Sequence, residues 1–272
     1  MTGAEWWFAR LYPGTPSGMD AAVAGAGAWA RQTARDIDAD CWYFIRYVDP
    51  TGVHVRLRLR AHPDALDELA ERTGPLQEIV SSAAPSAPRL LPEAGTLDLA
   101  GPAGIRLGVY EPEVDKYGAG HLPDAERCFQ ESSELLLDLD APARPANGAR
   151  TALAVHLMRR AAAAALPAGE IGGFWAHHRS YWGNALRALR LSKDTLRSRV
   201  AAITLELDRA APPAAELDRI SEWSAVLARR ISAAGPARRQ HLLFHHVHMT
   251  LNRLGYLPAE EALLGFVAQA GR

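Results

Sequence analysis

The sequence has few lysines, few cysteines and no excess of charge of either sign. Lys116 and Lys193 are the only lysines among 272 residues, whereas arginine is abundant, so a lysine in this chain is unusual. Lys and Arg together number 30, and Asp and Glu together number 31. Because a nucleic-acid-binding protein of this size is usually clearly basic, the charge balance argues against a nucleic-acid partner.

The two cysteines, Cys41 and Cys128, do not form a Cys-x-x-Cys pair, which argues against zinc-ribbon and thioredoxin-like sites. We expect both to be buried, reduced thiols. No apolar run approaches the roughly 20 residues that a membrane-spanning helix needs. The N-terminal residues also lack the charged-then-apolar pattern of a secretion signal. The sequence therefore predicts a cytoplasmic protein with no membrane partner.

Motifs for nucleotide and metal chemistry are missing too. The sequence has no Walker loop, no Gly-x-Gly-x-x-Gly after a predicted strand and no Gly-x-Ser-x-Gly elbow. His241 and His245 stand four residues apart, a spacing that two metal ligands on one helix face can use. No acidic third ligand is near them in the sequence, and the His-Glu-x-x-His pattern is absent. We expect neither a cofactor nor a metal ion.

The first 120 residues predict an α+β fold. Runs rich in aromatic and β-branched residues predict strands, and Pro- and Gly-containing turns separate them. The expected elements are strands at 5–12, 41–48, 53–59, 97–99 and 105–110, with one helix that ends near Arg35 and another at 63–84. The order β-α-β-β-α-β suits an antiparallel sheet with helices on one face, a ferredoxin-like layout.

After about residue 120 the sequence predicts helices only. The expected helices lie at 124–139, 149–166, 173–191, 192–210, 213–234 and 237–254. The connections between them are short, so we expect residues 1–120, the sheet-containing half, and residues 121–272, the helical half, to form a single domain.

The third predicted strand places a row of charges on one face. Apolar residues alternate with His54, Arg56, Arg58 and Arg60, as in a half-buried strand. Four such residues on one face would repel one another without anions nearby. The face is either solvated and paired with acidic residues, or a site where guanidinium groups bind a carboxylate in a bidentate way.

Two further segments carry candidate chemistry. The turn from Tyr110 to Gly118, with the sequence Tyr-Glu-Pro-Glu-Val-Asp-Lys-Tyr-Gly, follows a predicted strand. A Glu beside a Lys can act as a base–acid pair when partly buried, although an ordinary charged loop has the same composition. The last predicted helix carries His248, which can serve as an acid–base group or as a buried structural histidine. Asn252 and Arg253 lie one turn beyond it, where they can orient a substrate.

Taken together, these segments resemble the C-terminal elimination domain of lantibiotic dehydratases, also described as the thiopeptide-type bacteriocin biosynthesis domain. The resemblance covers nearly the whole chain and rests on segments in the right order: Trp6–Tyr12, Trp42–Pro50, His54–Arg58, Tyr110–Gly118 followed by Ala125, Glu126, Phe129 and Ser132, and His248–Leu254. It implies a role in maturing ribosomally made peptides. The implied partner is a modified precursor peptide with a leader sequence, together with other peptide-maturation enzymes.

The elimination branch of this family removes glutamate from glutamylated Ser or Thr to give dehydroamino acids. The positions that match its catalytic residues are Arg56, Arg58, Glu113 and His248. The next such position is normally arginine and is Lys116 here. Because a lysine cannot reproduce a bidentate fork, this departure weighs against glutamate elimination.

A sister branch comprises stand-alone pyridine synthases of thiopeptide pathways. They join two dehydroalanines in a formal [4+2] aza-cycloaddition and then lose water and often the leader peptide. We favour this pyridine-synthase-like reading, with glutamate elimination as the alternative and a non-catalytic peptide-binding subunit as a third possibility. The candidate residues are Glu113, His248, Arg58 and Lys116 for catalysis and Arg56, Tyr117, Asn252 and Arg253 for substrate binding.

Overall fold

We describe the chain from a computed structural model that covers residues 3–85, 89–95, 99–146 and 148–270. The chain divides into two compact units. Unit 1 comprises Met1–Ala87 with Asp98–Ala143, and unit 2 comprises Pro88–Leu97 with Arg144–Arg272. Helix α5 (Leu122–Asp138) packs on strand β2 (Cys41–Asp49) and therefore belongs to unit 1. That the chain forms a single domain stays a prediction.

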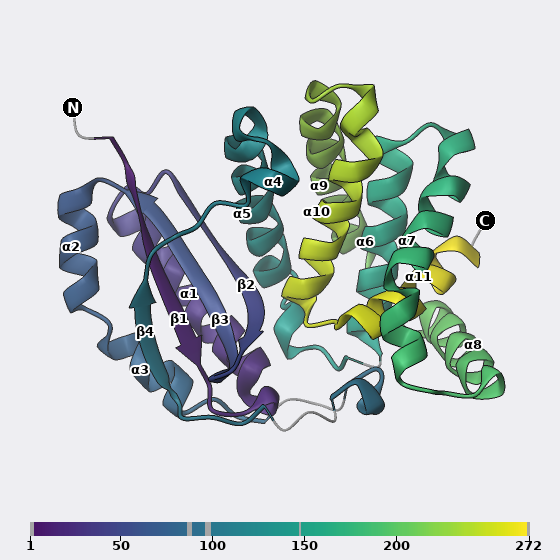
Figure 1. Ribbon diagram of the computed structural model, residues 1–272, viewed down its shortest axis with the longest axis horizontal. Helices are drawn as coiled ribbons and strands as arrows, with labels where there is room; N and C mark the ends of the chain where they lie inside the picture. Colours follow the sequence, from purple (N-terminus) through teal and green to yellow (C-terminus); the bar gives the residue numbers. More distant parts are fainter. Residues whose placement is uncertain (1–2, 86–88, 96–98, 147, 271–272) are drawn as a thin grey trace. The chain divides into compact units, whose positions relative to one another are not determined.

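Unit 1 is built on a four-stranded sheet in the order β2-β3-β1-β4 (Figure 1). Strands β1 (Glu5–Tyr12), β3 (Gly52–Ala61) and β4 (Gly104–Gly108) join β2, and all neighbours are antiparallel. Helix α1 (Met19–Asp36) connects β1 to β2, and two further helices connect β3 to β4. This order and connectivity confirm the expected ferredoxin-like first half.

The core of unit 1 lies on one face of this sheet. Trp7 and Leu11 of β1 and Leu57 and Leu59 of β3 belong to one buried cluster with apolar residues of the connecting helices. The expected alternation along β3 is therefore confirmed. Because successive side chains of a strand point to opposite faces, the other face of the sheet receives the charged residues of β3.

Two elements expected in the first 120 residues need correction, and a third lies partly outside the described residues. The helix expected at 63–84 is two helices, α2 (Pro63–Glu71) and α3 (Gly74–Ser81). Pro75 disfavours helical geometry in the residue before it and has no N–H to continue a helix, so the chain restarts there. The strand expected at 105–110 is β4, which ends at Gly108. Of the strand expected at 97–99, the first two residues lie outside the described residues, and Leu99 is not in a strand.

Unit 2 is helical. Its helices are α6 (Ala149–Ala165), α7 (Ala168–Ala188), α8 (Lys193–Arg209), α9 (Ala214–Ala233), α10 (Arg239–Leu254) and α11 (Pro258–Ala270). The first five were expected, although α7 begins at Ala168 and not at Gly173. Short 3-10 helices complete the chain at Pro16–Gly18, Pro92–Gly95, Ala119–His121, Ala141–Ala143 and Pro236–Arg238.

Helix α11 was not expected, but local signals for it exist. Gly255 adopts a left-handed conformation with φ of 93°, which ends α10, and Pro258 opens α11. Glu260 is buried and accepts a hydrogen bond from the backbone N–H of Leu257 at 2.9 Å, the reciprocal half of a capping box. It also pairs with Arg89. These contacts fix the first turn of α11.

Both cysteines are buried free thiols, as expected. Burial raises the pKa of Cys41 to about 12, so this thiol carries almost no thiolate at neutral pH. Within the described ranges, no helix is both long enough and apolar enough to cross a membrane.

Candidate functional site

The charged face of β3 is largely withdrawn from solvent. His54 is fully buried and Arg58 is only 6% exposed, while Arg56 and Arg60 are half-buried. Arg60 has acidic partners: its Nε lies 3.5 Å from Asp40 and its Nη1 3.9 Å from Glu126. One of the two interpretations of this face was that it is solvated and that its charges are paired with acidic residues. That interpretation fits Arg60 but not the other charged residues of β3.

Arg58 sits inside a cluster of aromatic rings. Its Cζ lies 5.1 Å from the ring centroids of Phe8 and Tyr43 and 5.3 Å from that of Tyr110. Cation–π contacts of this kind stabilise a guanidinium that has lost water. Its Nε and Nη1 are buried and have no hydrogen-bond partner among the described residues. Buried donors without acceptors are rare, and this pair is suited to an oxygen of a bound substrate.

A chain of hydrogen bonds runs beside Arg58. The Tyr43 hydroxyl donates to the Tyr110 hydroxyl at 3.1 Å, and the Tyr110 hydroxyl donates to Oε1 of Glu126 at 2.7 Å. Burial raises the pKa of Glu126, although the Tyr110 hydrogen bond and two arginines oppose the shift. Burial likewise raises the pKa of Tyr43 to about 12. A carboxyl of raised pKa linked to two phenols can take up or release a proton close to Arg58.

The sequence did not reveal this series of hydrogen bonds. Glu126 and Tyr110 stand in the segments that carry the family resemblance, but neither was assigned a role, and Tyr43 was seen only as part of a strand. The missing signal is spatial: helix α5 brings Glu126 to β2, where its backbone oxygen also accepts from the Cys41 thiol.

The turn after β4 places its predicted residues in different environments. Nζ of Lys116 lies 3.2 Å from Oε2 of Glu113, and both side chains are partly exposed. An exposed pair of this kind adds about 0–1 kcal/mol to stability. Tyr117, at the end of helix α4 (Val114–Tyr117), is fully buried and packs edge-to-face on Phe129. Tyr117 therefore anchors the turn, and contact with a substrate would require the turn to open.

Unit 2 holds a second polar group, centred on His248. Nδ1 of His248 lies 2.7 Å from Oε2 of Glu261, and Nε2 of His178 lies 3.1 Å from Oε1 of the same carboxylate. Glu261 and His178 are completely buried, whereas the His248 side chain is 24% exposed. The His248 ring stacks on Trp182 at 4.6 Å between centroids. Helices α7, α10 and α11 thus meet at one carboxylate.

This arrangement fixes the protonation pattern of His248. An ionised carboxylate only accepts hydrogen bonds, so the ring nitrogens that face Glu261 must carry protons. Burial alone would raise the pKa of Glu261, but the charge of His248 and the hydrogen bonds from both histidines outweigh it and lower that pKa. With Nδ1 protonated, Nε2 of His248 is the nitrogen that can accept or deliver a proton. Sequence reasoning found His248 but missed Glu261, His178 and Trp182.

The other predicted residues of α10 differ in their burial and contacts. Arg253 is 1% exposed, and its Nη1 donates to the backbone oxygen of Met249 at 2.9 Å, so its guanidinium lies inside unit 2. Asn252 is half-buried. The rings of His241 and His245 contact each other edge-to-face. The described part of the chain contains no group of three or more His, Cys, Asp or Glu side chains that could hold a metal ion.

The backbone of Gly265 in α11 packs closely against the ring of His178. A Cβ on Gly265 would lie 2.7 Å from Nδ1 of His178, which is closer than real contacts allow. The ring has little room to move, because Trp175 and Phe244 pack against it. We expect Gly265→Ala to lower the free energy of unfolding by about 1–3 kcal/mol, measured by urea denaturation.

Gly173→Ala is the matched control for this substitution. Gly173 lies in helix α7, and a Cβ there would meet nothing within 4 Å. Replacing a helical glycine by alanine at such a place should raise stability by about 0.5–1 kcal/mol. Equal stability of the two variants would contradict the tight fit at His178.

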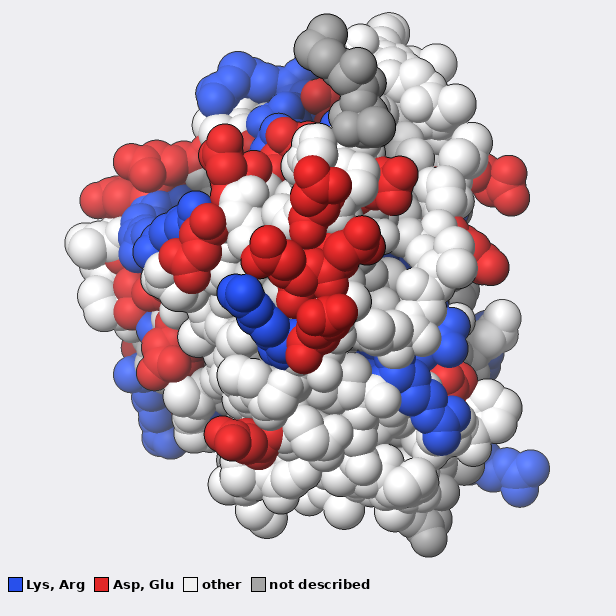
Figure 2. Space-filling view, turned by 90° about the vertical axis from the view of Figure 1, so that its left-hand side faces the viewer, with Lys and Arg blue, Asp and Glu red and all other residues white. Residues whose placement is uncertain are grey.

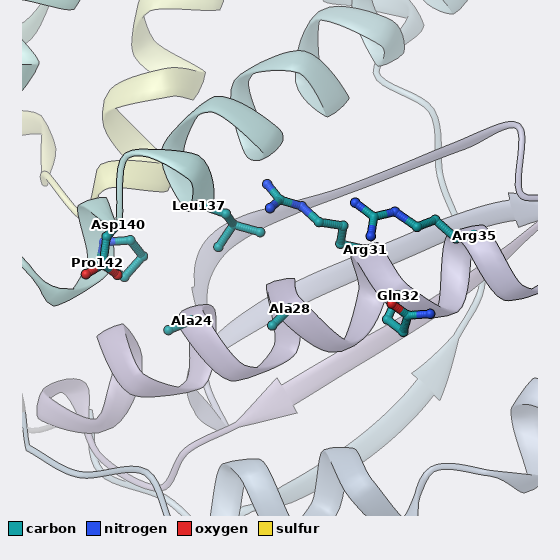
Figure 3. Close-up of a pocket in the computed structure, with 8 residues that line it drawn as sticks. All are labelled: Ala24, Ala28, Arg31, Gln32, Arg35, Leu137, Asp140 and Pro142. Atoms are coloured by element: carbon teal, nitrogen blue, oxygen red, sulfur yellow. The ribbon is translucent and has the colours of Figure 1, made fainter. Parts of the chain in front are cut away.

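Unit 1 also contains a small pocket (Figure 3). Residues of α1 and of the chain around the end of α5 line it, including Arg31, Gln32 and Leu137. The Arg31 charge is compensated by Glu134 at 2.7 Å and Asp138 at 2.8 Å. None of the residues predicted for the functional site lines this pocket.

The fold is that of an α+β protein with two compact units. One unit carries Arg58 among aromatic rings on a ferredoxin-like sheet, and the helical unit carries the His248–Glu261 pair. Residues 6–270 match the family described as lantibiotic biosynthesis dehydratase, C-terminal, and the chain belongs to that family. The resemblance drawn from the sequence is thereby confirmed.

Several solved structures share this fold. The tRNA-dependent lantibiotic dehydratase MibB from Microbispora sp. 107891 is 22% identical, with a TM-score of 0.66 over 99% of this chain and 28% of that chain. This chain therefore spans less than a third of the dehydratase. The pyridine synthase TbtD from thiomuracin biosynthesis is 21% identical, with a TM-score of 0.66 over 98% of this chain and 97% of that chain.

A third structure, TsrL, is 16% identical, with a TM-score of 0.61 over 98% of this chain and 94% of that chain. At these identities the likeness shows a shared fold. A search of curated proteins finds no match to the sequence.

Proposed function

We propose that this chain matures a ribosomally made peptide by joining two dehydroalanines in a formal [4+2] aza-cycloaddition, with loss of water and of the leader peptide. The observation that carries the proposal is the setting of Arg58. Its Nε and Nη1 donors, which have no partner in the described part of the chain, lie among aromatic rings, beside the Tyr43–Tyr110–Glu126 series of hydrogen bonds. A stabiliser of negative charge and a route for protons thus lie side by side, as this reaction requires.

The reaction begins with a shift of a proton within a peptide amide. The nitrogen of the amide loses its proton and the oxygen gains one, which gives an iminol conjugated with the first dehydroalanine. Arg58 would stabilise the negative oxygen that develops during this shift. Two carbon–carbon bonds to the second dehydroalanine close the ring, and the iminol oxygen then leaves as water. The flat aromatic walls around Arg58 suit a planar, conjugated substrate.

His248 is the proposed acid–base group of unit 2. Because Glu261 holds Nδ1 in its protonated form, Nε2 is available to take a proton from the peptide and to return it to a leaving group. Glu113 and Lys116 form the second proposed acid–base pair, on the turn after β4. Arg56 and Asn252, which are half-buried, are proposed to bind substrate directly. Tyr117 and Arg253 were also predicted to bind substrate, but both side chains are buried, so they would contact it only after a local opening of the structure.

Glutamate elimination is the second candidate, and one observation favours it. Nε and Nη1 of Arg58 are both buried without a hydrogen-bond partner among the described residues, and a departing carboxylate is an anion from which such donors can gain an acceptor. In that reaction a base removes the α-proton of a glutamylated Ser or Thr, and glutamate leaves from the β-carbon. Against it, Lys116 replaces the arginine of the elimination branch, and its charge is paired with Glu113.

Mass spectrometry with two substrates distinguishes the candidates. One substrate is a leader-containing peptide with two dehydroalanines, and the other is the same peptide with a glutamylated serine. We expect the first to lose water and its leader while a ring forms, and the second to stay unchanged. Loss of glutamate without cyclisation would establish elimination instead. No change in either substrate, together with measurable binding of both, would leave a non-catalytic peptide-binding role.

A further inference from the structure

Three arginines on three neighbouring strands of unit 1 occupy paired positions in the register of the sheet. In the register of the sheet, Arg10 of β1 lies opposite Arg56 of β3 on one side and opposite Arg106 of β4 on the other. We call these three residues the arginine row. They share the sheet face that carries Arg58, because each follows the same alternation. Arg10 and Arg106 were not among the residues singled out from the sequence.

The arginine row concentrates positive charge without acidic partners. Adjacent strands are about 4.8 Å apart, and like charges directly opposite each other destabilise a sheet. Elsewhere on the sheet arginines are paired: Arg46 lies 2.7 Å from Asp20, and Arg60 contacts Asp40. Among the described residues, no member of the arginine row forms an ion pair with a carboxylate.

The contacts that the row does make are with neutral groups. Arg56 donates to Nε2 of His54 at 3.3 Å, and its Cζ lies 3.3 Å from the centroid of the Tyr47 ring. Nη1 of Arg106 donates to Thr51 at 3.1 Å. Arg10 lies over Phe8 at 5.5 Å, and its Nε is buried with no hydrogen-bond partner among the described residues.

These neutral contacts orient the guanidinium groups, and no carboxylate of the described residues pairs with their charge. A bound anion would remove the repulsion and would satisfy the buried Nε of Arg10. The row therefore has the charge, the orientation and the unsatisfied donor of a binding site for anionic groups.

The surroundings point to carboxylates on a peptide and not to a nucleic acid. The chain has a net charge of −1, so the row is not part of a generally basic surface. Acidic side chains gather on the face of the molecule that includes α2 (Figure 2), and α2 packs on the opposite side of the sheet from the row. Aromatic rings next to the row can also contact apolar side chains of a peptide.

We propose that the arginine row binds an acidic segment of the peptide substrate, with Arg10, Arg56 and Arg106 each facing a carboxylate. This inference rests on the proposed function only in taking a peptide as the ligand. In an extended peptide, alternate side chains point the same way and lie about 6.5–7 Å apart, which three long guanidinium side chains in a row can reach. The row thus selects a peptide by its acidic residues.

Binding of two labelled peptides tests the inference. One carries glutamate at three alternate positions, and the other carries glutamine at the same positions. We expect fluorescence anisotropy at low salt to show at least about tenfold tighter binding of the glutamate peptide. Arg10→Gln should abolish most of this preference, and Arg106→Gln, which alters a more exposed side chain, should reduce it about threefold.

Arg35→Gln is the matched control, because Arg35 is an exposed arginine of α1, on the helix-covered side of the sheet. It should keep the full preference, and circular dichroism should show all three variants folded. Equal binding of the two peptides by the unaltered protein would overturn the inference, as would a preference that survives Arg10→Gln. Displacement of the glutamate peptide by inorganic phosphate at equal total charge would also overturn it, because it would indicate a general anion site.

The binding measurement needs no turnover, so its failure is distinct from failure of the proposed reaction. A protein that cyclises peptides but does not distinguish glutamate from glutamine would refute the arginine row alone. A protein that binds the glutamate peptide through Arg10 but transforms neither test substrate would refute the reaction alone.

Discussion

Glu261→Gln is expected to lower the rate of peptide processing by about 10²–10⁴-fold while the protein stays folded. The carboxylate holds Nδ1 of His248 at 2.7 Å and Nε2 of His178 at 3.1 Å. A neutral amide of the same shape can donate as well as accept, so it no longer requires a proton on Nδ1 of His248. The histidine then loses both its defined tautomer and its charged hydrogen-bond partner.

Glu260→Gln is the control for this variant, since Glu260 is the adjacent buried carboxylate of α11 but contacts Arg89 and the backbone of Leu91 and Leu257. It should reduce stability and leave the rate per folded molecule unchanged. The decisive measurement is the rate per folded molecule of the two variants, determined side by side. An unchanged rate for Glu261→Gln would show that the carboxylate has only a structural role.

Arg58→Lys is expected to lower the rate by about 10²–10³-fold, although it keeps the positive charge. An ammonium group is a compact point charge and cannot present several N–H donors in the fixed plane of a guanidinium. It also loses part of the contact of the guanidinium with the rings of Tyr43 and Tyr110. We therefore expect the free energy of unfolding to fall by about 1–2 kcal/mol, measured by urea denaturation.

Arg60→Lys is the matched control for Arg58→Lys. Arg60 is two residues along the same face of β3, but its charge is paired with Asp40 and Glu126 and its side chain is 35% exposed. The rate should change by less than about threefold, because a lysine can keep a loose ion pair. A similar loss of rate in the two variants would indicate that the whole strand face responds to charge and that the unpaired donors of Arg58 have no special role.

Local pattern was enough to predict most of unit 1. The alternation along β3 follows from the geometry of a strand with one buried face, so its apolar and charged positions were readable from the sequence. The order β-α-β-β-α-β limits the sheet to few topologies, and the observed order β2-β3-β1-β4 is one of them. The single helix expected at 63–84 is interrupted because Pro75 cannot continue a helix, so the chain forms α2 and α3 instead.

Only part of the candidate site could be predicted from the sequence. His248 and Arg58 stood out by residue type and by resemblance, yet the groups that define their chemistry come from distant positions. Glu261 was out of reach because the helix that carries it was not expected. The chain from Tyr43 through Tyr110 to Glu126 joins residues far apart in the sequence. Hydrogen bonds between distant segments leave no periodic signal in a sequence.

The sequence by itself determined the α+β class, the strand that presents the arginines and the family, because these depend on local periodicity and on ordered motifs. Only the tertiary structure decided which charges are paired. It gave Arg60 its acidic partners and left Arg58 and the arginine row without carboxylates among the described residues. It also placed His248 on Glu261. The electrostatic energy of a charged side chain depends on its burial and on the charges and hydrogen-bond partners within a few ångströms. Both are set only when the chain folds.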